Sequence, residues 1–300
     1  MKLYAPKYYK KFKCIADKCE HSCCIGWEID VDGDTLEKYR SLQNGYGKTV
    51  IDSISMEDTP HFKLCEGDRC PHLDENGLCR IILSVGEDYL CHICREHPRF
   101  YNFTDVCEVG IGMSCPEAAR IILGTSDYFE TELIGELDAE TCDVWFDARA
   151  ERGKIYEILQ NGALDYHSKL AEIREIYAIE PLFDGVWLEK LADLEYLDER
   201  HRDLFMNYSS ARRPSENHEY LERFLAYFIY RHCTEAEDEY DFRRRLSFCM
   251  FCESLFASLI CIDNAKTLND AAALASIISE EIEYSDENTW TLMDATQENV

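Results

Sequence analysis

Cysteines are the residues of this chain whose type and spacing indicate chemistry. The sequence has 300 residues and 16 cysteines. Thiolates bind zinc and iron, so clustered cysteines predict a metal site when they are reduced. Eleven of them precede residue 116, and these are Cys14, Cys19, Cys23, Cys24, Cys65, Cys70, Cys79, Cys91, Cys94, Cys107 and Cys115.

The spacing within this group supports metal binding. Cys91 and Cys94 form a C-x2-C pair, a gap that lets two sulfur atoms reach one ion from a tight turn. The first four cysteines form a C-x4-C-x3-C-C group, whose last two members are adjacent and poorly placed for a disulfide with each other. Cys70 and Cys79 flank a turn rich in Asp, Asn and Gly.

A disulfide scaffold is the alternative for so many cysteines. Such scaffolds belong to small domains in oxidising compartments, whereas this chain is 46% hydrophobic and long enough to form a conventional core. Its N-terminus also lacks the apolar segment of a secretory signal. We therefore expect a cytoplasmic protein with reduced, metal-binding cysteines.

Charge and hydropathy limit the partners. The formal net charge is -28, which repels nucleic acid and favours cationic partners such as lysine-rich protein surfaces. No segment approaches the ~20 apolar residues that span a bilayer. The most apolar run, residues 248–262, contains Glu253 and is predicted to be a buried helix. We expect neither nucleic-acid binding nor a membrane span.

Cys115 has a separate argument for metal binding. Alternating apolar residues at 109–113 predict a strand, and Ser114 with Glu117 predicts a capping box that starts a helix over 117–123. A thiol in the first helical turn has a lowered pKa and is more often a thiolate. The remaining cysteines are predicted to be core residues or inert, and these are Cys142, Cys233, Cys249, Cys252 and Cys261.

The pattern predicts a mainly α protein with a small α+β, loop-rich cysteine-cluster region at its N-terminus and a helical C-terminal half. Residues 27–31 alternate like a strand, and Asp34 with Glu37 is expected to cap the next helix. Apolar residues at helical spacing from Ile155 to Tyr177 predict a helix that Pro181 stops. Cysteine density sets a boundary: residues 1–125 are the cysteine-rich metal-binding region, and residues 126–300 are helical with an acidic C-terminal tail.

Four ordered segments of the N-terminal part resemble the flagellin lysine-N-methylases, a family that shares its cysteine cluster with a wider group described as zinc- or iron-chelating. A weaker similarity lies at Glu216–His232. The four segments are FKCIADKCEHSCCIGWEIDVD (Phe12–Asp32), RCPHLDENGLCRI (Arg69–Ile81), GEDYLCHICREHPRF (Gly86–Phe100) and SCPEAARIIL (Ser114–Leu123).

This resemblance implies a protein-lysine N-methyltransferase. It would use S-adenosylmethionine to methylate flagellin or another lysine-bearing surface protein, and it would carry an iron-sulfur cluster, with [4Fe-4S] as the expected form. Cys65 and Cys107 do not match family positions, and residues 130–215 are shorter than in the family. The ligands that the resemblance implies are Cys14, Cys19, Cys23, Cys24, Cys70, Cys79, Cys91, Cys94 and Cys115.

The sequence leaves a second interpretation open, a non-catalytic zinc- or iron-binding module. Nine thiolates would fill two tetrahedral zinc sites with one left over, or one cubane plus one zinc. Neither the residues nor the resemblance single out a catalytic base.

Overall fold

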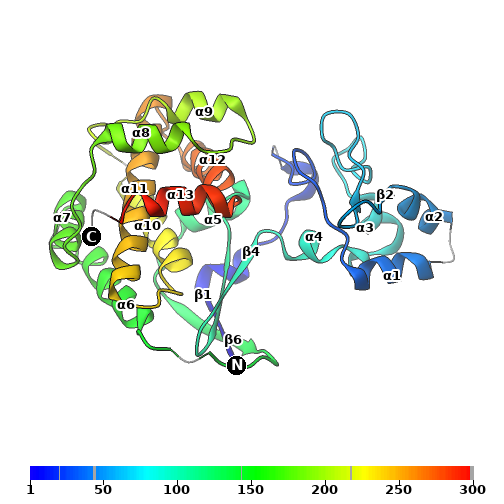
Figure 1. Ribbon diagram of the computed structural model, residues 1–300, viewed down its shortest axis with the longest axis horizontal. Coiled ribbons are helices and arrows are strands. Elements are labelled where there is room, and N and C mark those ends of the chain that lie inside the picture. The colour runs from blue at the N-terminus through cyan, green and yellow to red at the C-terminus, as the bar shows by residue number, and fades with distance from the viewer. Residues whose placement is uncertain (20, 43–44, 143, 217, 298–300) are drawn as a thin grey trace. The chain divides into compact units, whose positions relative to one another are not determined.

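The computed structural model describes residues 1–19, 21–42, 45–142, 144–216 and 218–297 (Figure 1). The chain forms two compact units. Unit 1 consists of Met1–Phe12 and Arg99–Val300, and unit 2 is the intervening segment Lys13–Pro98. The division at residue 125 that cysteine density predicts falls inside unit 1, which the chain re-enters at Arg99. Cys107 and Cys115 accordingly belong to unit 1.

Unit 1 contains a mixed four-stranded sheet in the order β4-β5-β1-β6. β1 pairs in parallel with β5 and antiparallel with β6, while β4 and β5 form an antiparallel pair. Every residue of β5 is buried, which places this strand in the core. The strands are β1 (Lys2–Pro6), β4 (Arg99–Phe103), β5 (Cys107–Ile111) and β6 (Thr131–Glu136).

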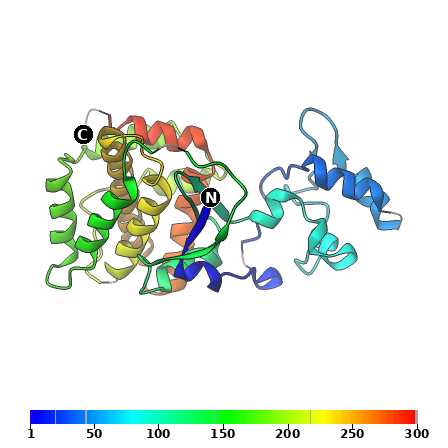
Figure 2. The ribbon, with the colours of Figure 1, turned by 90° about the horizontal axis from the view of Figure 1, so that it is seen from below.

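Helices make up the rest of unit 1. α10 packs on α11, α5 packs on α12, and α6 and α7 lie side by side (Figures 1 and 2). The α-helices are α5 (Pro116–Gly124), α6 (Ala148–Leu159), α7 (Tyr166–Ile176), α8 (Asp184–Ala192), α9 (Glu199–Phe205), α10 (His218–His232), α11 (Glu239–Asp263), α12 (Leu268–Ile278) and α13 (Asp286–Asp294). Two shorter elements are the 3-10 helix η1 (Lys7–Lys11) and the π-helix η4 (Ser279–Glu283).

α11 is the central helix of this unit. It is long and apolar enough to cross a membrane by length and composition, but 83% of its most apolar window is buried inside the unit. Phe224 on α10 stacks on Phe256 of α11 with ring centroids 4.4 Å apart. Cys249 and Cys252 lie in the same core and are fully buried, as their spacing on an apolar helix predicted.

Unit 2 has short elements around its own core, which is separate from the core of unit 1. Ile29, Tyr39, Val50 and Phe62 are among its buried residues. Its elements are η2 (Ala16–Lys18), α1 (Gly33–Ser41), α2 (Gly45–Asp52), β2 (Ile54–Ser55), β3 (His61–Phe62), α3 (Arg80–Val85), η3 (Glu87–Tyr89) and α4 (His92–Glu96).

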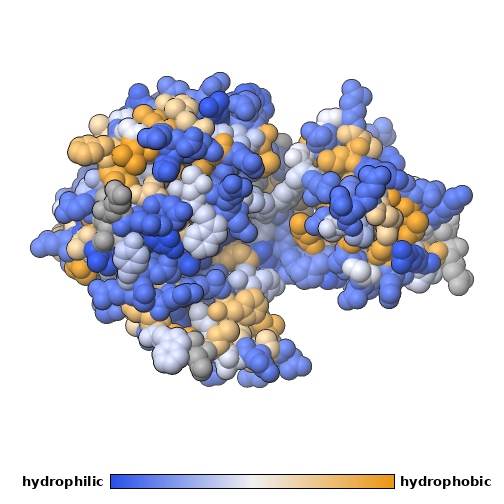
Figure 3. Space-filling view, viewed as in Figure 1, coloured by the Kyte–Doolittle hydropathy of each residue, from blue (hydrophilic) through white to orange (hydrophobic). Residues whose placement is uncertain are grey.

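The structure confirms the predicted fold class, a mainly α protein with a small α+β part. Hydrophilic residues cover most of the face shown in Figure 3, as a chain of net charge -28 requires. Three local predictions were wrong. Residues 27–31 form no strand, and their one β-bridge is at Asp30. The helix α1 is capped by Asp32 instead of Asp34. The helix expected from Ile155 is interrupted at residues 160–165, and Asp165 caps the next helix, α7.

Candidate metal centre

Five of the predicted ligands come together in the core of unit 2. Two of them are buried in it and the other three pack against it, so they share one hydrophobic cluster. Their thiols also alter one another's pKa, which requires that the sulfur atoms lie near one another. The five are Cys24, Cys70, Cys79, Cys91 and Cys94. We call them the thiol cluster.

Backbone pairing brings the first two members together. The N–H of Cys70 donates to the carbonyl of Cys24 at 2.9 Å, and Ile25 forms a bridge with Arg69. The intervening forty-odd residues therefore form a closed loop that returns to its start. Gly26 supports this return because its φ of +98° is a conformation that other residues rarely adopt.

A tight turn brings Cys79 back to Cys24 and Cys70. The Asp74 carboxylate accepts from the backbone N–H groups of Asn76 and Leu78, both at 2.8 Å. Such side-chain bonds stabilise a turn directly. Leu73 then bridges to Cys79, and the N–H of Arg80 donates to the carbonyl of His72 at 2.7 Å. The Asp, Asn and Gly residues noted in the sequence thus position a predicted ligand.

Helix α4 presents the C-x2-C pair. Cys91 immediately precedes α4 and Cys94 lies one turn later, so both thiols face the same side. The carboxylate of Asp32, which caps α1 by accepting from the N–H of Thr35, also accepts from the N–H of His92 at 2.7 Å. This one carboxylate therefore ties α1 to the start of α4.

The electrostatic environment differs from thiol to thiol. A hydrogen bond from Cys23 lowers the pKa of Cys24 to about 7, with help from Ser22 and from the positive charge of Arg69. Burial raises the pKa of Cys70 to about 12. The hydrogen bond between Cys94 and Cys91 raises the pKa of Cys94 and lowers the pKa of Cys91. Some members thus lose their proton more readily than others, and a bound metal would favour the thiolate form of each.

The four other predicted ligands lie outside the core of unit 2, although Cys23 hydrogen bonds to Cys24 of the thiol cluster. Cys14, Cys19 and Cys23 belong to unit 2, where Cys14 and Cys23 are exposed and the Cys19 thiol donates to the carbonyl of His21 at 2.9 Å. Cys115 belongs to unit 1 and packs against its core. The structure therefore groups five of the nine predicted ligands in the core of unit 2.

The capping box predicted at Ser114 was wrong. Cys115 itself is the N-cap of α5, and its side chain makes no capping bond. Glu117 pairs instead with Arg120 at 2.6 Å, and the buried hydroxyl of Ser114 has no hydrogen-bond partner among the residues that the structure describes. The helix itself is confirmed, since α5 covers the expected residues 117–123.

The donor set fits a thiophilic metal. All 16 cysteines lie in the described part of the chain and all are free, so the disulfide alternative finds no support. In that same part, no three His, Cys, Asp or Glu side chains converge to the geometry of a bound ion. The thiol cluster therefore supplies the right atoms in one place, without a preformed coordination shell.

Two residues around the cluster were missed at the sequence level. The hydroxyl of Tyr39 lies 3.5 Å from the Cys91 sulfur and donates to the carbonyl of Tyr89 at 2.7 Å. The ring of His72 is 2% exposed, and both of its nitrogens are hydrogen bonded, to Tyr46 and Ser53, each at 2.9 Å. Tyrosine at a buried helical position is ordinary in a sequence, so no signal distinguished Tyr39.

Comparison with known proteins shows sequence similarity over 130 residues. No family model matches the chain, and no solved structure matches it. It is 30% identical over 130 residues to the flagellar biosynthetic protein FliU of Salmonella muenchen, a match that covers 41% of this chain and 77% of that protein. It is 28% identical over 130 residues to proteins named Lysine-N-methylase in Salmonella typhimurium strain LT2 and Salmonella choleraesuis, of which the match covers 32%.

The fold and the site define a two-unit protein in which a thiol-rich segment is inserted into a mainly helical unit. The chain belongs to the flagellin lysine-N-methylase family. Its match spans about a third of the length of the two relatives named Lysine-N-methylase.

Proposed function

We propose that this chain is a protein-lysine N-methyltransferase that acts on flagellin or a similar surface protein in the cytoplasm. Its cofactors are S-adenosylmethionine and an iron-sulfur cluster, with [4Fe-4S] as the expected form. The observation that carries the proposal is the coincidence of family membership with the thiol cluster, whose five cysteines are all among the nine ligands that the sequence resemblance implies.

The cluster ligands would come from unit 2. Cys24, Cys70, Cys79, Cys91 and Cys94 are the best candidates because they share one core, and four thiolates suffice for a [4Fe-4S] cluster. The hydroxyl of Tyr39 lies 3.5 Å from the Cys91 sulfur and would donate to it as a ligand if its proton turned away from the carbonyl of Tyr89, and such a contact tunes metal sites. Cys14, Cys19, Cys23 and Cys115 remain ligands predicted from the family resemblance alone.

The reaction makes limited demands on the chain. S-adenosylmethionine supplies an electrophilic methyl group, and a lysine amine attacks it only when neutral. The chain must therefore align the two substrates and let the lysine lose its proton. Its net charge of -28 supports the lysine-rich partner, because it attracts cationic surfaces over a long range.

Two measurements test the proposal. Protein purified without oxygen should be brown, with iron and sulfide in stoichiometric amounts. Incubation with methyl-labelled S-adenosylmethionine and flagellin should then place label on lysine. A protein with a full metal content that transfers no label to any lysine would contradict the proposed activity.

Cysteine variants test the site itself. Cys70→Ser and Cys91→Ser should each lower the iron content and the visible absorbance, because serine is a poor ligand for iron. Cys65→Ser is the matched control, since Cys65 is exposed, lies in the same unit and is outside the thiol cluster. Equal iron content in all three variants would remove the thiol cluster as the metal site.

A second candidate function is a non-catalytic zinc or iron module. It is favoured by the packing of all five thiols against the core of unit 2, where a metal would cross-link otherwise loop-rich segments. A colourless protein that holds stoichiometric zinc and transfers no methyl group would establish this function instead.

A further inference from the structure

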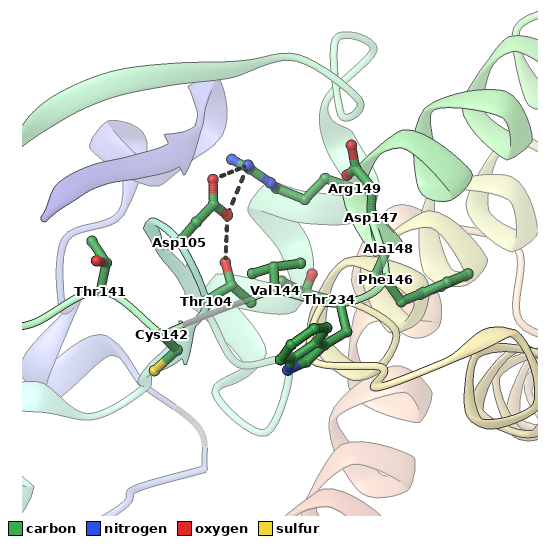
Figure 4. A pocket seen from close by; sticks show the side chains of 11 residues that line it. Thr104, Asp105, Thr141, Cys142, Val144, Phe146, Asp147, Ala148, Arg149 and Thr234 are labelled. Atoms are coloured by element: carbon green, nitrogen blue, oxygen red, sulfur yellow. Dashed lines mark hydrogen bonds and ion pairs between the residues drawn. The ribbon is translucent and has the colours of Figure 1, made fainter.

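Unit 1 contains a cavity of about 580 Å³ that the thiol cluster does not use. It lies between the β4–β5 turn, the segment before α6 and the first turn of α6 (Figure 4). Cavities of about 300–1,000 Å³ are the size that binds small molecules and cofactors. The argument depends on four of its lining residues, Asp105, Trp145, Arg149 and Thr234.

An accessible ion pair lies in this cavity. One nitrogen of Arg149, Nη2, donates to both carboxylate oxygens of Asp105, at 2.8 and 2.9 Å (Figure 4). The Arg149 side chain is 33% exposed and that of Asp105 48%, so the pair contributes little to stability. Nε and Nη1 of Arg149 donate to no residue that the structure describes. A guanidinium with unused donors is suited to bind a carboxylate from a ligand.

An exposed apolar surface lies beside the ion pair. Trp145 is 93% exposed and Val144 is 43% exposed, and both line the cavity. Single exposed aromatic residues are common, and Phe183 is 85% exposed on another part of unit 1. Trp145 differs because it lines the same cavity as the exposed Asp105–Arg149 ion pair. An indole ring can stack on a planar base or attract a cation.

Thr234, which lines the cavity, is hydrogen bonded to two other residues. Thr234 accepts a hydrogen bond from Arg152 at 2.5 Å and donates to the carbonyl of Tyr230 at 2.6 Å. Arg152 also forms a buried, two-point ion pair with Glu108, at 2.7 and 2.9 Å. These polar groups are already paired with one another. The other charged residue that lines the cavity, Asp147, caps α6 by accepting from the N–H of Ala150. The exposed Asp105–Arg149 pair is therefore the charged pair offered to a ligand.

We propose that this cavity binds an α-amino acid zwitterion that carries a planar or cationic group. Asp105 binds the α-ammonium, Arg149 binds the α-carboxylate, and Trp145 packs against the remainder of the ligand. S-adenosylmethionine belongs to this chemical class, since it combines an amino acid, a sulfonium and an adenine. As the donor site of a methyltransferase, the assignment rests on the proposed function.

Binding of S-adenosylhomocysteine, measured by calorimetry on the full chain prepared without oxygen, tests the assignment. Trp145→Ala and Arg149→Met should each weaken binding at least tenfold. The matched controls are Phe183→Ala, which removes an equally exposed ring, and Arg200→Met, which breaks the exposed Asp198–Arg200 ion pair. Both controls should bind within twofold of the unchanged protein. Circular dichroism and thermal melting verify that each variant is folded.

Fragments of the ligand separate the two parts of the cavity. Free methionine should compete through Arg149, and adenosine should compete through Trp145. Loss of binding in Cys70→Ser combined with unchanged binding in both cavity variants would overturn the assignment, because the ligand would then bind at the metal centre. Absence of any binding by the unchanged protein would also overturn it.

The assignment and the proposed function fail in different ways. Lysine methylation that is insensitive to Trp145→Ala and Arg149→Met would leave the function intact and refute the cavity. Cavity-dependent binding without methylation of any lysine would leave the cavity intact and refute the methyltransferase.

Discussion

Replacing Glu108 by glutamine should destabilise unit 1 strongly. The Glu108 side chain is 2% exposed and that of Arg152 is 7% exposed, and they form a two-point ion pair. Glutamine has the same shape, but its amide NH2 would face the guanidinium in place of a carboxylate oxygen. The positive charge of Arg152 would then remain buried with neutral partners: the glutamine carbonyl, the hydroxyl of Thr234 and the rings of Tyr230 and Tyr156, 4.8 and 6.0 Å away.

The expected loss follows from the cost of leaving one charge of a buried pair alone, about 3–5 kcal/mol. For a unit of about two hundred residues, each kcal/mol lowers the melting temperature by about 2–4 °C, so Glu108→Gln should melt about 6–20 °C lower. Thermal unfolding followed by circular dichroism measures this shift.

Two further variants make the measurement specific. Glu199→Gln is the control, because Glu199 is 82% exposed and its nearest contact with Arg202 is 3.9 Å, and it should cost less than about 0.5 kcal/mol. The double variant Glu108→Gln with Arg152→Met should recover much of the loss, since it removes the stranded charge. A loss below about 1 kcal/mol in Glu108→Gln would refute the claim that this pair stays buried and unsolvated.

Three other predictions concern stability. Burial lowers the pKa of His232 below its ordinary 6.5, so the unfolded chain binds more protons than the folded chain just below pH 6.5. The free energy of unfolding, measured in urea, should therefore fall from pH 7.5 to pH 5.5. His232→Asn should reduce this pH dependence. Asp32→Ala removes the cap of α1 and should lower the free energy of unfolding by about 0.5–2 kcal/mol. It should also lower the iron content, because the N–H of His92 at the start of α4 loses its hydrogen bond to Asp32. Asp34→Ala should leave the iron content unchanged. Trp187→Ala removes a 4% exposed ring that stacks at 3.7 Å on Phe251, and chemical denaturation should show a loss of about 3–5 kcal/mol.

The sequence predicted element types better than element ends. Helical periodicity identified the region of α6 and α7 and the mainly α class because packing of an apolar face is encoded locally. Caps were less predictable, since several polar residues compete for the position and tertiary contacts decide between them. Asp32 caps the helix instead of Asp34 because its carboxylate accepts hydrogen bonds from the N–H of Thr35 and from the N–H of His92. His92 lies sixty residues further along the chain.

The grouping of cysteines within the candidate site could not be predicted from spacing alone. Cys24 and Cys70 meet through a backbone hydrogen bond across 46 residues, and no local pattern encodes such a contact. The assignment of Cys115 to unit 1 was equally hidden, because unit 2 is inserted between two segments of unit 1. Cysteine density decreases along the sequence without marking where the chain re-enters the first unit.

This insertion makes a last prediction about unfolding. The chain leaves unit 1 after Phe12 and returns at Arg99, and Arg99 is held within unit 1 by a 2.9 Å hydrogen bond to the hydroxyl of Tyr9 and by the ring of Phe12. The two units also have separate hydrophobic cores. Unit 1 therefore has its own anchors at both connections and does not need the fold of unit 2 to complete its core.

Metal should consequently stabilise one unit alone. A ligand that binds only the folded state raises stability by RT ln(1 + [L]/Kd), and here that gain applies to unit 2. Calorimetry of the metal-loaded protein should show two unfolding transitions. A chelator should lower the melting temperature of unit 2 and leave the melting temperature of unit 1 unchanged. Glu108→Gln should do the reverse, because its buried pair lies in unit 1. If chelator and variant both shifted one common transition, the units would unfold together and the metal could not be acting on unit 2 alone.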